Sequence, residues 1–181
     1  ASLQLFKDGR FTAITLAGRS PASPPLPPQL RANLERYATS QAGYLTNAKT
    51  MNLSCGWPES WHSDTHATEG YVVMHEVGLC CLCTAISGLR GWLPKDRCWQ
   101  LIRTSLQTIE LIQSKPAEFP DGSFYRYYWI RHPDGRDRLP SEVIHDPGAG
   151  NQPSSDDNGL LVHSLLLIRS LAFEQQQTDV S

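Results

Sequence analysis

Several features typical of membrane-spanning or nucleic-acid-binding proteins are missing from this sequence. No run of about 18 apolar residues occurs, so no membrane-spanning helix and no membrane partner is expected. The 16 lysine and arginine residues are balanced by 18 aspartate and glutamate residues, and the formal net charge is -2. This balance leaves no basic surface for nucleic acid. The chain begins at Ala1 without methionine or a signal-peptide pattern, as expected of a processed or excised chain.

The cysteines are irregularly spaced. The five residues are Cys55, Cys80, Cys81, Cys83 and Cys98. This odd number allows one disulfide and leaves at least one thiol free in a monomer. Cys80, Cys81 and Cys83 fall in an apolar helical run, and their spacing is poor for zinc. We therefore expect no metal site.

One short motif bears on localisation. Asn52, Leu53 and Ser54 form a glycosylation sequon, a pattern typical of surface loops in secreted proteins. On this ground we expect an extracellular, secreted glycoprotein.

The first third of the 181-residue chain is predicted to be mostly irregular. Residues 1–29 are expected to be an extended segment, with a hairpin turn at Asp8-Gly9 and a proline-rich connector over 20–29. Leu30, Leu34 and Tyr37 recur at helical spacing, which predicts a helix over about 28–42. Residues 43–66 are expected to be a long loop. Residues 30–181 are thus the predicted helical domain.

The rest of the chain predicts a mainly α fold with one β-hairpin excursion. Residues 67–88 are apolar on almost all sides, which is typical of a buried helix. An outer helix is expected over 95–114, where Cys98, Ile102, Leu106, Ile109 and Ile112 form one stripe. A β-hairpin follows over 122–146. The apolar run after Ser155 predicts a second buried helix.

Three stretches of this region are similar to motifs of a known enzyme family. They read "GLCCLCTAISGLRGWLPKDRCWQLIRTSLQTI", "GSFYRYYWIRHPDGR" and "SSDDNGLLVHSLLLIRSLA". In order and separation, residues from about 69 to 172 resemble the glycoamylase-like glycoside hydrolases, a group that includes endo-β-1,2-glucanases. The resemblance implies helical hairpins of an α/α toroid and hydrolysis of a β-linked glucan with inversion, without an organic cofactor.

The length of the chain bears on this resemblance. A six-hairpin toroid needs about twelve helices of ordinary length, which is more than 181 residues provide. The toroid is therefore expected to be incomplete in this chain. A missing segment or a second copy is expected to complete it.

Glycoside hydrolysis needs one carboxyl group as acid and a second carboxylate as base or nucleophile. Asp156 and Asp157 stand at a predicted helix start, where a carboxylate is held ionised and suits a base. Glu142, in the preceding loop, is the candidate acid if burial raises its pKa. Each also has a structural interpretation: helix capping for the two aspartates, and a solvated loop residue for Glu142.

Aromatic and polar side chains supply the candidate sugar-binding set, because aromatic planes suit the C–H faces of sugar rings. In the hairpin, alternation places Tyr125, Tyr127 and Trp129 on one face and Phe124, Tyr128 and Ile130 on the other. The candidate substrate-binding residues are Trp57, Trp61, Glu69, Tyr125, Tyr127 and His145. His75, Glu76 and His163 interrupt apolar helices, as either satisfied core residues or sugar ligands.

Three functions remain open from the sequence. The first is a secreted glycoside hydrolase, or a segment of one, acting on an oligo- or polysaccharide such as β-1,2-glucan. The second is a non-catalytic carbohydrate-binding or scaffold module with the same hairpins. The third is a helical protein that acts through protein contacts.

Overall fold

The computed structural model describes residues 2–7, 10–15, 27–62, 67–68, 70–148 and 152–174; at 2–15, 41, 61–62, 67–68 and 173–174 only the backbone is described. The chain divides into two compact units, Ala1–Glu35 and Arg36–Ser181. In the part described, the protein is mainly α with small antiparallel sheets, as the sequence predicts.

The first unit holds the predicted hairpin. Strands β1 (Ser2–Lys7) and β2 (Arg10–Thr15) pair antiparallel, with Lys7 opposite Arg10. Helix α1 (Pro28–Ala42) runs across the boundary into the second unit and matches the predicted 28–42. Pro28 suits its first position because the ring fixes φ and the missing N–H has no helical acceptor there.

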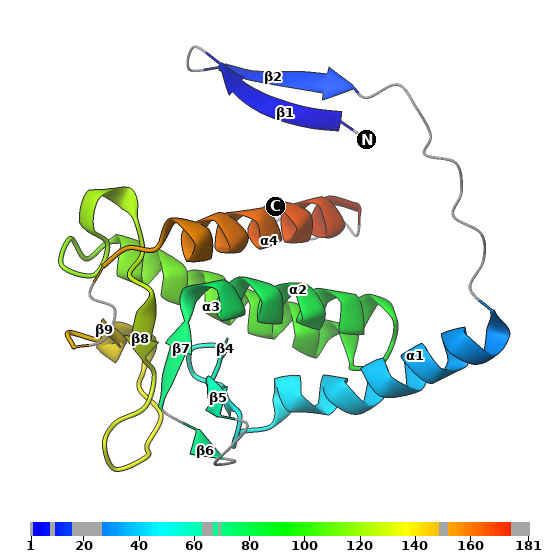
Figure 1. Ribbon diagram of the computed structural model, residues 1–181, viewed down its shortest axis with the longest axis horizontal. Coiled ribbons are helices and arrows are strands. Elements are labelled where there is room, and N and C mark those ends of the chain that lie inside the picture. Colours follow the sequence, from blue (N-terminus) through cyan, green and yellow to red (C-terminus); the bar gives the residue numbers. More distant parts are fainter. Residues whose placement is uncertain are drawn as a thin grey trace. The chain divides into compact units, whose positions relative to one another are not determined.

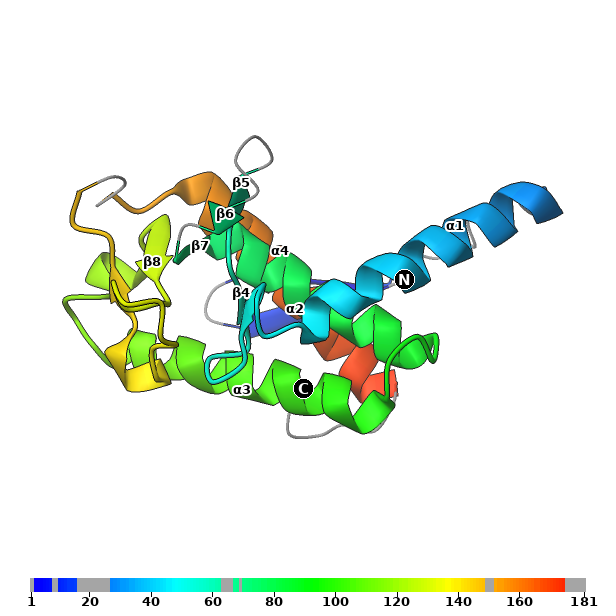
Figure 2. The same cartoon turned by 90° about the horizontal axis from the view of Figure 1, so that it is seen from below.

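Three longer helices form the frame of the second unit (Figures 1 and 2). Helix α2 (Met74–Leu89) contacts both α3 (Lys95–Gln113) and α4 (Ser155–Glu174). Apolar side chains from all three helices make the core, among them Val77, Ile102 and Ile168. Full burial of each such side chain stabilises the fold by about 1.5–3 kcal/mol.

A glycine sets the distance between α2 and α4. A Cβ atom at Gly78 would lie 3.0 Å from Leu161 Cα and 3.0 Å from Ser164 Cβ. The two helix backbones therefore approach more closely here than a larger residue would allow.

A three-stranded sheet adjoins the N-terminal end of α2, which directly follows its first strand. Its order is β7-β8-β9, formed antiparallel by β7 (Tyr71–Val73), β8 (Tyr127–Trp129) and β9 (Ile144–His145). Val72 lies opposite Tyr128, and both side chains are fully buried against the helices. The other face of the sheet carries half-exposed aromatic rings.

Short elements occupy the predicted loop over 43–66. They are the 3-10 turn η1 (Gly43–Thr46) and the two-residue strands β3 (Met51–Asn52), β4 (Trp57–Pro58) and β5 (Trp61–His62). Strand β6 (Ala67–Thr68), which pairs with β5, stands at the start of the predicted helix over 67–88. The 3-10 turn η2 (Pro120–Gly122) precedes β8, and η3 (Pro140–Glu142) lies in the connection between β8 and β9.

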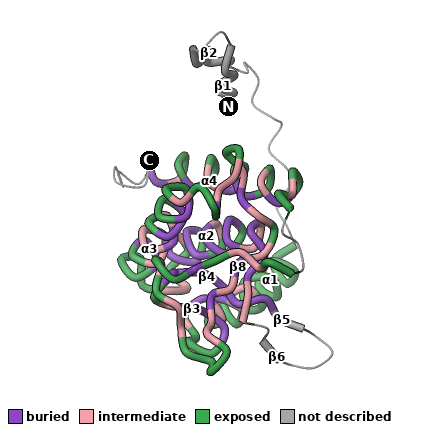
Figure 3. Tube along the Cα trace, turned by 90° about the vertical axis from the view of Figure 1, so that its left-hand side faces the viewer, coloured by how far each residue is buried: buried purple, intermediate pink, exposed green. Residues whose placement is uncertain are grey.

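Two helix predictions were wrong in part. The buried helix predicted from residue 67 begins only at Met74, because Tyr71–Val73 pairs with β8. The predicted burial of α2 and α4 on nearly all sides also fails. Figure 3 shows the outer side of α4 exposed, and Leu160, Val162, Leu166 and Leu167 on α4, with Leu79 and Ile86 on α2, are exposed.

Asn52 of the sequon is fully buried. Its side-chain amide donates to the carbonyl oxygens of Ile130 (2.7 Å) and Arg138 (2.8 Å). A glycan on this nitrogen would displace both hydrogen bonds, so the folded chain has no room for one here. Secretion remains a prediction. None of the helices in the described ranges is long and apolar enough to cross a membrane.

Candidate functional site

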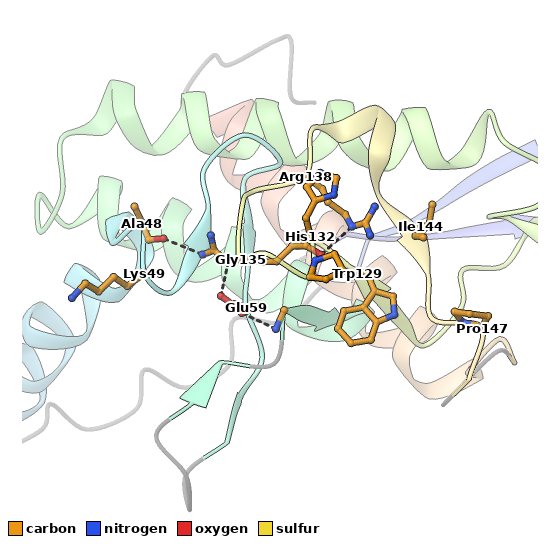
Figure 4. Close-up of a pocket in the computed structure, with 12 residues that line it drawn as sticks. Ala48, Lys49, Glu59, Trp129, His132, Gly135, Arg138, Ile144 and Pro147 are labelled. Carbon is orange, nitrogen blue, oxygen red and sulfur yellow. Dashed lines mark hydrogen bonds and ion pairs between the residues drawn. The ribbon is translucent and has the colours of Figure 1, made fainter.

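A groove of about 830 Å³ lies beside the half-exposed face of the sheet (Figure 4). Its walls come from separate segments: the turn before β3 (Ala48, Lys49), the start of β7 (Gly70), the end of β8 (Trp129), the loop that follows β8 (Arg131, His132, Pro133, Gly135, Arg138), and β9 with the residues after it (Ile144, Pro147). In Figure 4, Lys49 lies at one end, and Trp129, Ile144 and Pro147 lie at the other. The groove thus joins an aromatic end to a cationic end.

A buried ion-pair cluster forms the base of the groove. Glu59, with 2% of its side chain exposed, accepts from Arg131 Nε at 2.8 Å and from the Gly70 N–H at 2.7 Å. Arg131 also pairs with Asp137 and donates through Nη2 to the Ala48 carbonyl at 3.0 Å. These N–H groups of Arg131 bond to groups of the protein itself. Arg131 therefore holds the walls of the groove in position.

Gly70 lets the backbone pass beneath Trp129. It has φ +76, a conformation that favours glycine. A Cβ atom there would lie 3.5 Å from the indole ring of Trp129. The Gly70 carbonyl accepts from the N–H groups of Ile130 (2.9 Å) and Arg131 (3.0 Å). The Trp129 ring thus lies close to Gly70, and Trp129 is half-exposed.

Polar side chains form the rim. His132 Nε2 lies 3.3 Å from Glu142 Oε2. Arg138 donates through Nε to the Arg131 carbonyl and through Nη1 to the Glu142 carbonyl, each at 3.0 Å. These backbone acceptors hold Arg138 in place without neutralising its charge. Lys49 and Arg138 therefore bring positive charge to the groove.

Glu142 does not have the surroundings expected of an acid. It is exposed, and the Leu139 N–H donates to its carboxylate at 2.8 Å. This hydrogen bond, followed by that from His132, lowers the pKa of Glu142 below its ordinary value. The expectation that burial raises this pKa was wrong, because the side chain is not buried.

The two aspartates at the start of α4 differ from each other. Asp157 has only 8% of its side chain exposed, contacts His75 Nδ1 through Oδ1, and lies 3.4 Å from Arg126 Nε through Oδ2. Asp156 is exposed. Neither of them lines the groove, nor does Glu142, which contacts two residues that do: His132 through its carboxylate and Arg138 through its carbonyl oxygen. The structure therefore does not bring the three predicted catalytic carboxylates to one groove.

The predicted alternation of the hairpin is confirmed. Phe124, Tyr128 and Ile130 are buried, whereas Tyr125, Tyr127 and Trp129 are half-buried. Tyr127 lies on the exposed sheet face, and the Arg126 guanidinium is 5.1 Å from the centre of its ring.

Tyr125 and His145 contact each other away from the groove. Tyr125 stacks on the imidazole of His145 with 4.1 Å between ring centres. His145 receives support from Glu118, whose Oε2 lies 3.0 Å from Nδ1 and accepts the backbone N–H at 2.6 Å. Neither residue lines the groove.

Other candidates turn out to be structural. Trp57 is a core residue with 0% of its surface exposed, and its ring packs edge-to-face on Tyr128 at 6.1 Å. It cannot contact a sugar at the surface. Glu76 accepts from Ser60 Oγ at 2.5 Å and from the Val73 N–H at 3.2 Å, so it is a satisfied polar residue.

His163 is exposed on α4, in contrast to the core position considered for it.

Two candidates cannot be placed. The side chain of Trp61 and the whole of Glu69 lie outside the described residues.

All five cysteines are free. Burial raises the pKa of Cys55 to about 12 and that of Cys81 to about 11, which disfavours thiolate chemistry at either residue. Within the described ranges, no group of three His, Cys, Asp or Glu residues is arranged to hold a metal ion.

Comparison with known proteins adds no relative. No protein-family model, curated protein or solved structure matches the chain. The groove residues missed by sequence reasoning are mainly Lys49, Glu59, Gly70, Arg131, His132 and Arg138. Their signal was weak, because they belong to segments that tertiary contacts alone bring together.

Proposed function

We propose that the protein binds an oligo- or polysaccharide in the groove beside Trp129, with β-linked glucans as the first class to test. One observation supports this proposal most directly. The half-exposed indole of Trp129 lies close to Gly70, in a groove that is also lined by the hydrogen-bond donors Lys49 and Arg138. An aromatic face suits the C–H face of a sugar ring, and cationic donors suit its hydroxyl groups.

Binding without hydrolysis is the preferred form of this proposal. An inverting glycosidase needs a carboxyl group that stays protonated until it donates its proton to the leaving oxygen. Glu59 lines the groove and is paired with Arg131, and Glu142, which contacts His132 at the rim, has a lowered pKa. The lowered pKa of Glu142 favours its ionised form, which suits a base or a sugar ligand and not an acid, and the Glu59 carboxylate is already occupied by Arg131 and the Gly70 N–H.

Hydrolysis of a β-linked glucan, including β-1,2-glucan, is the second candidate. The contact between Glu142 and His132 at the rim favours it, because an ionised carboxylate there can act as the base. In this proposal the helices α2, α3 and α4 are part of an incomplete α/α toroid in an extracellular protein. A missing segment or a second copy then covers the exposed apolar residues of α2 and α4.

The test measures binding and cleavage together. Dissociation constants for β-1,2-, β-1,3- and β-1,4-linked glucans should be determined by calorimetry, while new reducing ends are assayed in the same samples. We expect Trp129→Ala to weaken binding at least about tenfold, a loss of about 1.4 kcal/mol. Trp92→Ala, in the loop between α2 and α3, is the matched control and should bind normally.

The results separate the two candidates. Binding without new reducing ends supports the binding module. Release of reducing ends that Glu142→Gln abolishes supports the hydrolase. No binding of any glucan, or equal binding by wild type and Trp129→Ala, contradicts the proposed function.

A further inference from the structure

The aromatic face of the sheet continues beyond the groove. Trp129 pairs with Tyr71 across β7 and β8, and their ring centres are 5.7 Å apart. Tyr71 is in turn 5.2 Å from Tyr127, the next residue on the same face of β8. Adjacent rings are nearly perpendicular, at 89° and 80°. All three are half-buried, so they form an unbroken aromatic strip with one end in the groove.

A polar cluster lies at the other end of the strip. The Arg126 guanidinium is 5.1 Å from the centre of the Tyr127 ring and reaches Asp157 at 3.4 Å. The second oxygen of Asp157 contacts His75 Nδ1. Arg126 has 52% of its side chain exposed and His75 has 30%, whereas Asp157 is buried beneath them. The buried carboxylate thus holds two partly exposed polar groups at the starts of α2 and α4.

The contact with Asp157 determines which ring nitrogen of His75 is available to a ligand. Since Asp157 takes Nδ1, Nε2 is the ring nitrogen that a ligand hydroxyl can reach. Arg126 has further N–H groups besides Nε. The cluster can therefore hydrogen-bond a polar ligand that lies along the strip.

We propose that the groove and the strip form one continuous track for a saccharide chain of about three or more sugar residues, long enough to span the three rings. The chain runs from Trp129 over Tyr71 and Tyr127 to hydroxyl contacts with Arg126 and His75. This inference rests on the proposed function and adds to it: the ligand is an extended chain and not a mono- or disaccharide. The ring spacings of 5.2 and 5.7 Å are comparable with the width of one pyranose ring.

The track is tested by the dependence of affinity on chain length. β-1,2-linked gluco-oligosaccharides from two to six residues, then the β-1,3 and β-1,4 series, should be titrated into the whole chain by calorimetry. We expect affinity to rise steeply up to about three or four residues and then to level off. Tyr127→Ala and Arg126→Gln should each weaken hexasaccharide binding about fivefold to tenfold and leave disaccharide binding unchanged.

Controls separate a folding defect from a loss of the track. Tyr37→Ala, which removes an exposed tyrosine of α1, should bind every ligand normally. Tyr127→Phe keeps the ring and should retain most of the hexasaccharide affinity, even if Tyr127→Ala folds poorly. Equal affinity for disaccharide and hexasaccharide, or a hexasaccharide affinity unchanged by Arg126→Gln, overturns the track but not the proposed function. No binding of any saccharide overturns both.

Discussion

At the residue scale, Asp156 and Asp157 show how far a sequence motif can be interpreted. Helix capping was one interpretation of the pair, but the side chain that accepts a helix N–H here is Ser154, whose Oγ accepts the Asp157 N–H at 3.3 Å. The sequence could not show that Asp157 turns inward to His75 and Arg126, because both partners are distant along the chain.

This contrast gives a paired stability prediction. Asp157→Asn should lower the free energy of unfolding by about 1–3 kcal/mol, because it removes the buried charge that holds two partners. Asp156→Asn, at the exposed neighbouring position, should change it by less than about 0.5 kcal/mol. Urea denaturation at neutral pH measures both values. Equal effects of the two substitutions would contradict the interpretation of Asp157.

The lowered pKa of Glu142 predicts a specific pH dependence. The group contributes stability above the pKa of an unfolded-state carboxyl, and this contribution fades as the pH falls through the lowered folded value. His132→Ala should raise the pKa of Glu142 only in part, since the hydrogen bond from Leu139 is the larger cause. Carbon NMR titration of the carboxyl group measures this. A wild-type pKa of Glu142 above that of an ordinary glutamate would contradict this account and would suit a general acid.

At the scale of elements, periodicity predicted helices well and short strands poorly. The stripe of α3 and the spacing in α1 located both helices. The run before Met74 was assigned to a helix because a continuous apolar stretch does not distinguish a strand from a helix. Val72 and Val73 are β-branched residues typical of strands, but their pairing with β8 is a tertiary contact. For the same reason the short strands of 43–62 were predicted as loop.

The packing of α2 on α4 predicts opposite effects for two glycine substitutions. Gly78→Ala should lower the free energy of unfolding by about 1–3 kcal/mol, because the new Cβ would crowd the backbone of Leu161. Gly159→Ala, where no atom lies within 4 Å, should stabilise α4 by up to about 1 kcal/mol. Thermal unfolding followed by circular dichroism gives both values. Stabilisation by Gly78→Ala would contradict the close approach of the two helices.

At the scale of the whole molecule, the sequence predicted the class of fold but not the groove. An apolar composition on all sides of α2 and α4 suggested full burial. It could not show which side stays exposed, since that depends on how many elements surround each helix. The groove depends on Lys49, Gly70, Trp129 and Arg138 meeting in space. Only the aromatic alternation of β8 signalled one of its walls.

Ligand binding should raise the stability of the whole protein if the groove is a saccharide site. A ligand at about 100 times its dissociation constant adds about 2.7 kcal/mol to the folded state. For a chain of this size that corresponds to a rise of about 5–10 °C in Tm. Thermal scans with hexasaccharide test this for wild type, with Trp129→Ala as the variant expected to show a smaller rise. A wild-type Tm that stays constant as the hexasaccharide concentration rises to its solubility limit would contradict saccharide binding.

The most direct test of the central claim follows the indole N–H resonances of the five tryptophans by NMR during titration with a gluco-oligosaccharide. Trp129, assigned by loss of its signal in Trp129→Phe, should shift progressively and saturate, while the buried Trp57 and Trp99 should remain in place. Shifts at other tryptophans with Trp129 unchanged, or no shift at any of them, would contradict saccharide binding in this groove.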